Sequence, residues 1–259
     1  MEFRRYFRLA AVALAFAGFA GATHADTTIK AKAAARPLGV IELFTSQGCN
    51  SCPPADELFA KFAAQDDMVA LAYHVTYWDY LGWQDKLGSN DNTERQYAYM
   101  RAFGARSVYT PQAVINGRTH VNGAKSEDVT GALDKLAETG QGMNVDLNVT
   151  DNGDTFTIEV GAAKGPASPA HVVVVHYQPP QVVDLQKGEN KGRSVTYWNA
   201  VTDLHTAGMW HGQTQRFELP KSEVEKKGGC AVLLQAVGKD GVPGPILGAA
   251  VVRKPAPAL

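Results

Sequence analysis

The stretch FTSQGCNSCPPADELF, residues 44–59, places Cys49 and Cys52 between an apolar run and a helical pattern. The run before it, LGVIELFT, is rich in strand-forming residues and ends at a turn signal. After it, apolar residues recur at i, i+4 spacing over residues 53–64, with acidic residues in the first turn. The pattern predicts a strand, a short turn, a C-x-x-C pair and then a helix.

The predicted position of Cys49, at the start of a helix, has a chemical consequence. Unpaired backbone N–H groups and the positive end of the helix dipole stabilise a thiolate there. A thiolate attacks a disulfide, and Cys52, one turn further on, would resolve the mixed disulfide that forms. We therefore predict thiol–disulfide exchange, with Cys49 as the nucleophile and Cys52 as the resolving thiol. No cofactor is predicted.

Two other interpretations of the cysteine pair stay open. Two sulfur ligands and His74 could hold Cu(I), as in a copper-binding protein or metallochaperone. A histidine on an apolar run is also typical of a buried structural residue. Zinc is disfavoured, because a second C-x-x-C or a histidine pair is missing. Alternatively, the pair could be a structural disulfide in a non-catalytic binding module.

The first 25 residues have the pattern of a secretory signal peptide. Three arginines precede an apolar stretch over residues 9–19, and small residues follow, with cleavage expected after Ala25. The apolar stretch is shorter than the roughly 20 residues of a membrane-spanning helix. Residues 26–37 read as a flexible lead-in. We expect an exported protein, periplasmic in a bacterium or secreted, in a compartment where disulfides persist.

The charge of the chain argues against nucleic acid as a partner. The formal net charge is −1, and removing the signal peptide with its three arginines and one glutamate makes it more negative. The sequence has no basic block. We expect a protein or small-thiol disulfide as substrate and a redox partner protein, with no membrane association after cleavage.

Patterning divides the remaining chain into two regions. Residues 38–141 predict the order β-α-β-α-β-β-α, with a hairpin at Asn116-Gly117 and a last helix that ends at Gly140. Residues 142–254 contain seven short alternating or apolar runs separated by glycine and proline turn signals. Even strand spacing of this kind predicts a second domain, rich in strands and similar to a β-sandwich.

The two motifs VIELFTSQGCNSCPPADELF, residues 40–59, and SVYTPQAVING, residues 107–117, together resemble the thioredoxin superfamily. The resemblance implies a cis bond between Thr110 and Pro111, which would line a substrate groove opposite the cysteines. It also implies a buried acid on the first strand that accepts the proton of the resolving cysteine. Glu42 is the candidate, although it lies one residue further from Cys49 than in the usual spacing.

A closer resemblance extends over residues 38–252. The segments ELFTSQGCNSCPPAD, YWDYLGW, YTPQAVING and KGENKGRSVTYWNAV resemble an exported bacterial thioredoxin-like family, domain of unknown function 1223. That family has no settled activity. The expected fold class is therefore α/β, a thioredoxin-like domain over 38–141 followed by a β-sandwich-like domain over 142–254. Asn50 and Ser51 differ from the usual thioredoxin pairs and leave the direction of exchange open.

An aromatic loop, YHVTYWDYLGWQDKLG, follows the second predicted strand. Tyr77 and Trp78 could form an apolar groove for a substrate peptide, with Asp79 and Asp85 as polar anchors. Alternatively, the rings could fill the gap between two domains, since domain interfaces also recruit tryptophan and tyrosine.

Three further features have simple interpretations. Cys230 begins an apolar run and is predicted to be a buried free thiol, with an intermolecular disulfide as the alternative. The segment HTAGMWHG contains His205, Met209 and His211, which could ligate a soft metal but are more typical of a turn after a strand. The charged segment QKGENKGR is predicted to be a solvated hairpin loop.

Overall fold

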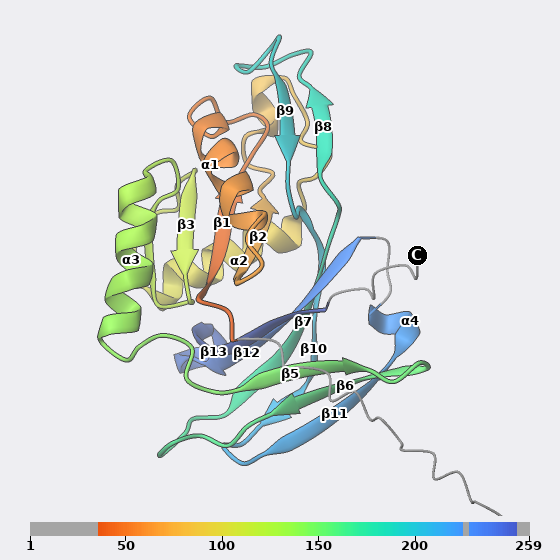
Figure 1. Cartoon of the computed structure of the whole chain (residues 1–259). Coiled ribbons are helices and arrows are strands. Elements are labelled where there is room, and N and C mark those ends of the chain that lie inside the picture. The colour runs from red at the N-terminus through yellow and green to blue at the C-terminus, as the bar shows by residue number, and fades with distance from the viewer. Residues whose placement is uncertain (1–35, 225–227, 253–259) are drawn as a thin grey trace, which may run out of the picture. The chain divides into compact units, whose positions relative to one another are not determined.

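The computed structural model describes residues 36–224 and 228–252 (Figure 1). The predicted signal peptide, residues 1–25, lies outside the described residues, as do most of the lead-in and residues 253–254. Within the described ranges, no helix has the length and apolar character needed to cross a membrane.

The first sheet is built around a strand that is buried along its whole length. Strand β1 (Gly39–Thr45) pairs in parallel with β2 (Met68–His74) and antiparallel with β3 (Gln112–Ile115), which pairs with β4 (Thr119–Asn122). Every residue of β1 and β2 is buried, as expected for continuous apolar runs covered on both faces. The strand order is β2-β1-β3-β4.

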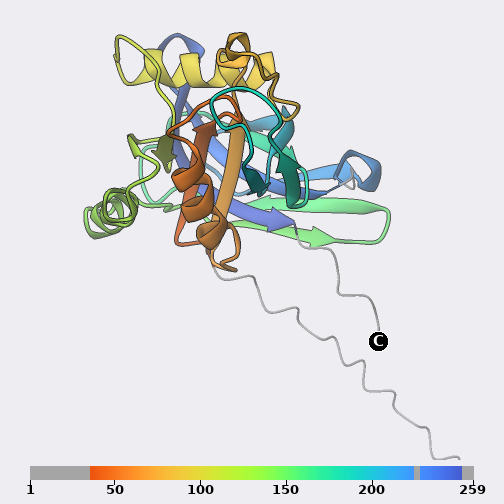
Figure 2. The same cartoon turned by 90° about the horizontal axis from the view of Figure 1, so that it is seen from above.

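Helices cover both faces of this sheet (Figures 1 and 2). Helices α1 (Pro53–Ala63) and α3 (Ser126–Glu138) pack on one face, where Ile41, Leu43 and Phe59 share a cluster. Helix α2 (Asn90–Ala102) packs on the other face, and the short helix η1 (Asp79–Leu81) precedes it. The order of elements predicted for residues 38–141 is found.

The second half of the chain forms three more sheets. A four-stranded antiparallel sheet has the order β10-β7-β12-β13, a three-stranded sheet the order β11-β6-β5, and β8 pairs with β9. The elements are β5 (Leu147–Asp151), β6 (Thr155–Val160), β7 (Ala170–Tyr177), β8 (Gln181–Asp184), β9 (Ser194–Tyr197), β10 (Val201–Trp210), β11 (Gln215–Pro220), α4 (Lys221–Val224), β12 (Gly229–Val237), η2 (Lys239–Gly241) and β13 (Pro243–Val252).

The predicted fold class, an α/β thioredoxin-like domain followed by a β-sandwich-like domain, is wrong. The structure is β-rich: strands make up 40% of it and helices 21%, and the strands lie in several sheets. Strands β8 and β10 were not predicted. The segment HTAGMWHG, interpreted as a turn, supplies the end of the ten-residue strand β10. Strand β10 lies at the edge of its sheet, where half-exposed positions accept polar side chains. Its sequence therefore lacks the apolar pattern by which a strand is predicted.

The two halves share one hydrophobic core. Val40, Phe44 and Leu71 from the first sheet cluster with Val173 and Leu233 from the sheet of β7 and β12. The backbone joins the halves too: the N–H of residue 72 donates to the carbonyl of residue 199 at 3.0 Å. The division into two domains, residues 38–141 and 142–254, stays a prediction.

Candidate functional site

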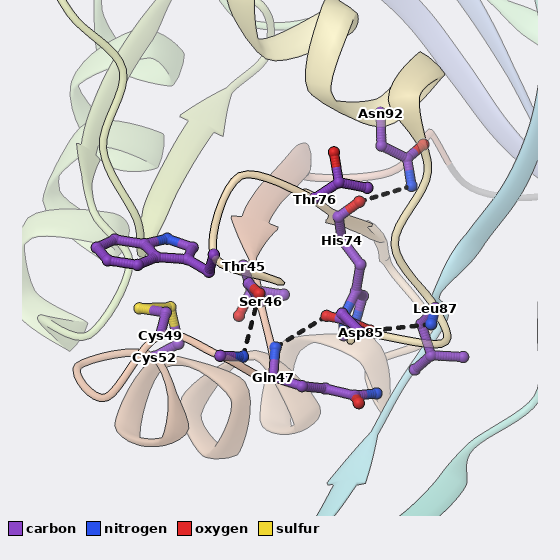
Figure 3. A network of polar contacts seen from close by, with 12 residues as sticks. Thr45, Ser46, Gln47, Cys49, Cys52, His74, Thr76, Asp85, Leu87 and Asn92 are labelled. Atoms are coloured by element: carbon purple, nitrogen blue, oxygen red, sulfur yellow. Dashed lines mark hydrogen bonds and ion pairs between the residues drawn. A yellow bond between two sulfur atoms is a disulfide. The ribbon is translucent and has the colours of Figure 1, made fainter. Parts of the chain in front are cut away.

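Cys49 and Cys52 form a disulfide at the start of α1 (Figure 3). Their Cα atoms are 5.4 Å apart. Cys52 is the N-cap residue, and its carbonyl accepts the backbone N–H of Asp56 at 3.0 Å. Relative to the cysteine pair, helix α1 therefore begins later than predicted, and Cys49 lies in the turn before the helix rather than at its first position. Both cysteines are almost completely covered, with exposed fractions of 1% for Cys49 and 0% for Cys52.

The peptide bond between Thr110 and Pro111 is cis, as predicted. Thr110 reaches the disulfide through Ser51, whose Oγ lies 3.4 Å from Cys49 Sγ and 3.5 Å from the carbonyl oxygen of Thr110. The middle of the C-x-x-C motif therefore connects the Cys49 sulfur to the segment that was predicted to bind substrate.

Trp78 spans the space between the cysteine turn and Thr110. Its indole Nε1 donates to Thr110 Oγ1 at 2.8 Å. At its other end, a Cβ atom added to Gly48 would lie 3.0 Å from the Cβ of Trp78, so a side chain at position 48 would be crowded. Trp78 thus lies against the residue before Cys49 and is held by the residue before Pro111.

Three side chains from two segments hold the cysteine turn, and all three contact Gln47. Its backbone N–H donates to Asp85 Oδ2 at 2.8 Å, and its side-chain oxygen accepts Trp83 Nε1 at 2.8 Å. Asn190 Nδ2 donates to the carbonyls of Gln47 at 3.0 Å and Cys49 at 2.8 Å. The segment QKGENKGR is a mostly exposed hairpin loop between β8 and β9, as predicted, but Asn190 within it is only 1% exposed.

A cluster of buried ionisable groups lies where β1 and β2 end. Thr45 and His74 are the last paired residues of these two strands. Thr45 Oγ1 donates to Asp56 Oδ1 at 2.8 Å, and His74 Nδ1 lies 2.8 Å from Asp85 Oδ2. Figure 3 shows that the pair of His74 and Asp85 is joined to the cysteine turn through Gln47. Asp56 follows Cys52 by four residues, which places both on the same face of α1.

Burial shifts the proton equilibria of this cluster. Burial raises the pKa of Asp56 from 3.8 to about 7, although His74 and the Thr45 hydroxyl lower it in part. Burial lowers the pKa of His74, but the Asp85 carboxylate outweighs that effect and raises it overall. For Asp85, burial acts to raise the pKa, and His74 with the backbone donors outweighs this and lowers it. Asp56 is therefore a buried acid that can gain or lose a proton near neutral pH.

Glu42 takes part in a different network. Alternation along β1 places it on the face of Val40 and Phe44, opposite α1. There it accepts Arg95 Nε at 2.8 Å and the hydroxyl of Tyr99. Among the described hydrogen bonds and ion pairs of Glu42, none involves a cysteine. The proton-accepting role of Glu42 stays a prediction.

Asp56 is the residue that the sequence interpretation missed. It was taken as one of the acidic residues of a helix's first turn, where a carboxylate normally faces solvent. The signal that could have found it is its i+4 spacing from Cys52, together with its place on the apolar face that Ala55 and Phe59 share.

The aromatic loop combines features of both interpretations made for it. Tyr77 and Trp78 are partly buried against the shared core, and the Tyr77 hydroxyl donates to Gln96 Oε1 at 3.1 Å. Tyr80 is 78% exposed. Asp85 is buried with His74 and Asp79 accepts the backbone N–H of Asp85 at 3.1 Å, so both carboxylates hold the loop itself.

The structure also shows the surroundings of Cys230 and of the three residues considered as Cu(I) ligands. Cys230 is buried, 2% exposed, and is not part of a disulfide in the described chain, as predicted. His74, the third ligand of the Cu(I) alternative, is fully buried and its Nδ1 is bonded to Asp85. The two thiols of that alternative are joined to each other in the disulfide.

Comparisons with known proteins place the chain in a family. The family model described as protein of unknown function (DUF1223) matches residues 40–235. A structural-genomics crystal structure from Agrobacterium tumefaciens is 46% identical, with a TM-score of 0.79, and the match covers 86% of this chain and 97% of that one. The structure of HBP35 of Porphyromonas gingivalis shares the fold at 13% identity and a TM-score of 0.57, covering 85% of this chain and 76% of that one. No curated protein matches.

Proposed function

The chain belongs to the DUF1223 family, and we propose that it is an exported thiol–disulfide oxidoreductase acting through Cys49 and Cys52. The observation that carries the proposal is a buried acid, Asp56, one helical turn after the resolving cysteine. The local resemblance of the C-x-x-C and Thr-Pro motifs to the thioredoxin superfamily supports the same activity.

The exchange reaction balances without a cofactor. A substrate thiolate attacks Cys49 Sγ, the bond between Cys49 and Cys52 breaks, and Cys52 leaves as a thiolate. A second substrate thiolate then attacks the mixed disulfide and releases Cys49. The substrate dithiol loses two electrons and two protons and becomes a disulfide, while the cysteine pair gains them. The reverse sequence reduces a substrate disulfide.

Asp56 would serve the departing sulfur of Cys52. A group whose pKa lies near the working pH both donates and accepts protons effectively, and the pKa of Asp56 is about 7. The N-terminus of α1 adds its positive dipole end to stabilise the thiolate. A disulfide that only cross-links the chain needs no buried carboxyl group, and burying one is unfavourable. The acid therefore favours redox exchange over a purely structural disulfide.

Substrate would approach Cys49 between Trp78 and Thr110. Cys49 is 1% exposed, so attack on its sulfur requires that this cover opens. Because Trp78 belongs to a loop while Thr110 precedes a buried strand, Trp78 is the part we expect to move. Thr110 is half-buried, and once Trp78 moves, the Thr110 backbone would suit a substrate in extended conformation, either a protein segment or a small thiol.

The Cu(I) alternative is supported less well. Binding would first require reduction of the disulfide, because both sulfur ligands are bonded to each other. Titration of the reduced protein with Cu(I) separates the two functions, because a copper carrier should bind one ion tightly and lose it in Cys49→Ser.

Trapping of mixed disulfides tests the redox proposal. In Cys52→Ser, Cys49 keeps its thiol but the resolving step is absent, so adducts with substrate proteins from a periplasmic extract should accumulate. They should disappear on treatment with dithiothreitol. The matched control is the double variant Cys49→Ser/Cys52→Ser, which keeps Cys230 and should form none. The proposal fails if Cys52→Ser traps nothing and the wild-type disulfide also resists dithiothreitol.

A further inference from the structure

Three side chains that can ligate a metal meet on the sheet of β7 and β10, away from the cysteine pair in sequence. They are His176 on β7 and Asp203 and His205 on β10, and their ligand atoms all lie within 4.8 Å of one another. The strand pairing explains the meeting. Asp203 and His205 are two residues apart, so they project from one face of β10, and Asp203 pairs directly with His176 across the two strands.

The spacing of the ligand atoms fits a single ion. His205 Nδ1 lies 3.5 Å from Asp203 Oδ2, and the rings of His176 and His205 lie with their centroids 5.7 Å apart at 25°. Around tetrahedral zinc, with bonds of about 2.0–2.2 Å, neighbouring ligand atoms are roughly 3.4 Å apart. Small side-chain rotations would therefore bring all three groups to bonding distance.

The burial of the three groups also suits a metal site. His176 is 1% exposed and is held within the sheet, whereas the side chains of Asp203 and His205 are 44% and 32% exposed. One ligand is thus fixed by the fold and two face the solvent, so an ion can enter and a fourth position can hold water. Two imidazoles and one carboxylate are a donor set typical of zinc sites that keep an open position.

We propose that His176, Asp203 and His205 bind one divalent transition-metal ion, with Zn²⁺ the best match. This site differs from the set that the sequence suggested. His205 remains a ligand, but Asp203 and His176 take the places of Met209 and His211, since pairing between β7 and β10 decides which residues meet. The proposal is independent of the activity proposed for the cysteine pair.

Metal titration of the full chain with its disulfide intact tests the site, since the oxidised cysteines cannot bind. The protein is first treated with a chelator and then titrated with Zn²⁺ by calorimetry and with Co²⁺ by absorption. We expect one equivalent to bind, and a Co²⁺ spectrum without the intense thiolate band. Zn²⁺ should also raise the melting temperature.

Substitutions assign the ligands. His205→Ala and Asp203→Asn, at partly exposed positions, should each lower the Zn²⁺ affinity at least about tenfold, in line with the loss of a direct metal ligand. Each variant should melt like the metal-free wild type but gain no stability from Zn²⁺. His211→Ala and Met209→Leu are the matched controls and should bind normally. Absence of stoichiometric binding, or unchanged affinity in both ligand variants, would overturn the assignment.

Discussion

His74 Nδ1 lies 2.8 Å from Asp85 Oδ2, and both side chains are fully buried. The same carboxylate oxygen accepts the backbone N–H of Gln47 in the cysteine turn. One buried ion pair therefore ties the end of β2 to the turn that presents Cys49. Both charges also shift the pKa of the neighbouring Asp56. The protonation of Asp56 therefore depends on His74 and Asp85 as well as on its own burial.

Asp56→Asn should slow reduction of the disulfide by dithiothreitol at pH 7 at least about tenfold, because Cys52 then leaves without a proton donor and such donors contribute about 10²–10⁴-fold. Rapid mixing with acid quench and alkylation measures the rate. Glu42→Gln is the matched control, since Glu42 faces Arg95 on the other side of β1. If the disulfide is reduced slowly in Glu42→Gln and at the wild-type rate in Asp56→Asn, the proton transfer belongs to Glu42.

Asp56 should also make the stability of the oxidised protein depend on pH. The folded protein keeps the Asp56 proton up to about pH 7, while the unfolded chain loses it near pH 3.8. Between these values the folded state binds more protons, so this group lowers the free energy of unfolding as pH rises. At about 1.4 kcal/mol per pKa unit, the penalty approaches roughly 4 kcal/mol.

Asp56→Asn should therefore gain stability relative to wild type as the pH rises from about 4 to about 8. Urea unfolding at several pH values measures the difference. Asp134→Asn, at an exposed position, is the control. A difference between Asp56→Asn and wild type that does not change with pH would contradict the raised pKa of Asp56.

Trp78→Ala should speed reduction of the disulfide by glutathione several-fold, because it removes the side chain that spans from Gly48 to Thr110. Trp78→Phe loses only the indole hydrogen bond and should give a smaller increase. Tyr80→Ala, in the same loop but exposed, should match wild type. If the rate is the same in all three variants, Trp78 does not control access to Cys49.

Asn190→Ala should destabilise the protein by about 1–3 kcal/mol, because it removes the side-chain donor of the Gln47 carbonyl and leaves the Cys49 carbonyl with only the backbone N–H of Cys52. Urea unfolding of the oxidised protein measures the change. Glu189→Ala, the exposed neighbour in the same turn, should shift stability by less than about 0.5 kcal/mol. Equal effects in both variants would show that Asn190 adds nothing specific.

Local features of the chain were predictable because short-range physics decides them. The hairpin at Asn116 and Gly117 is found with positive φ at both residues, 49° and 61°, as this dipeptide favours. The helix expected over residues 53–64 is α1, one residue shorter. Helix α2 begins at residue 90, where the Ser89 hydroxyl caps it by accepting the N–H of Asn92.

The sequence by itself determined the cysteine pair at a helix start, the Thr-Pro segment, and most strands and helices of residues 38–141. Tertiary structure alone decided the fold class, because strand β10 and its pairing with β7 depend on neighbours rather than on the pattern of β10. It also decided which buried acid lies in the helix that follows the cysteines and which one lies on the opposite face of β1. Asp56 and Glu42 are both buried. Asp56 on α1 accepts the hydroxyl of Thr45, whereas Glu42 points to the other face of β1 and contacts Arg95. Asn190 reaches Cys49 across 141 residues of chain, a contact that no local pattern contains.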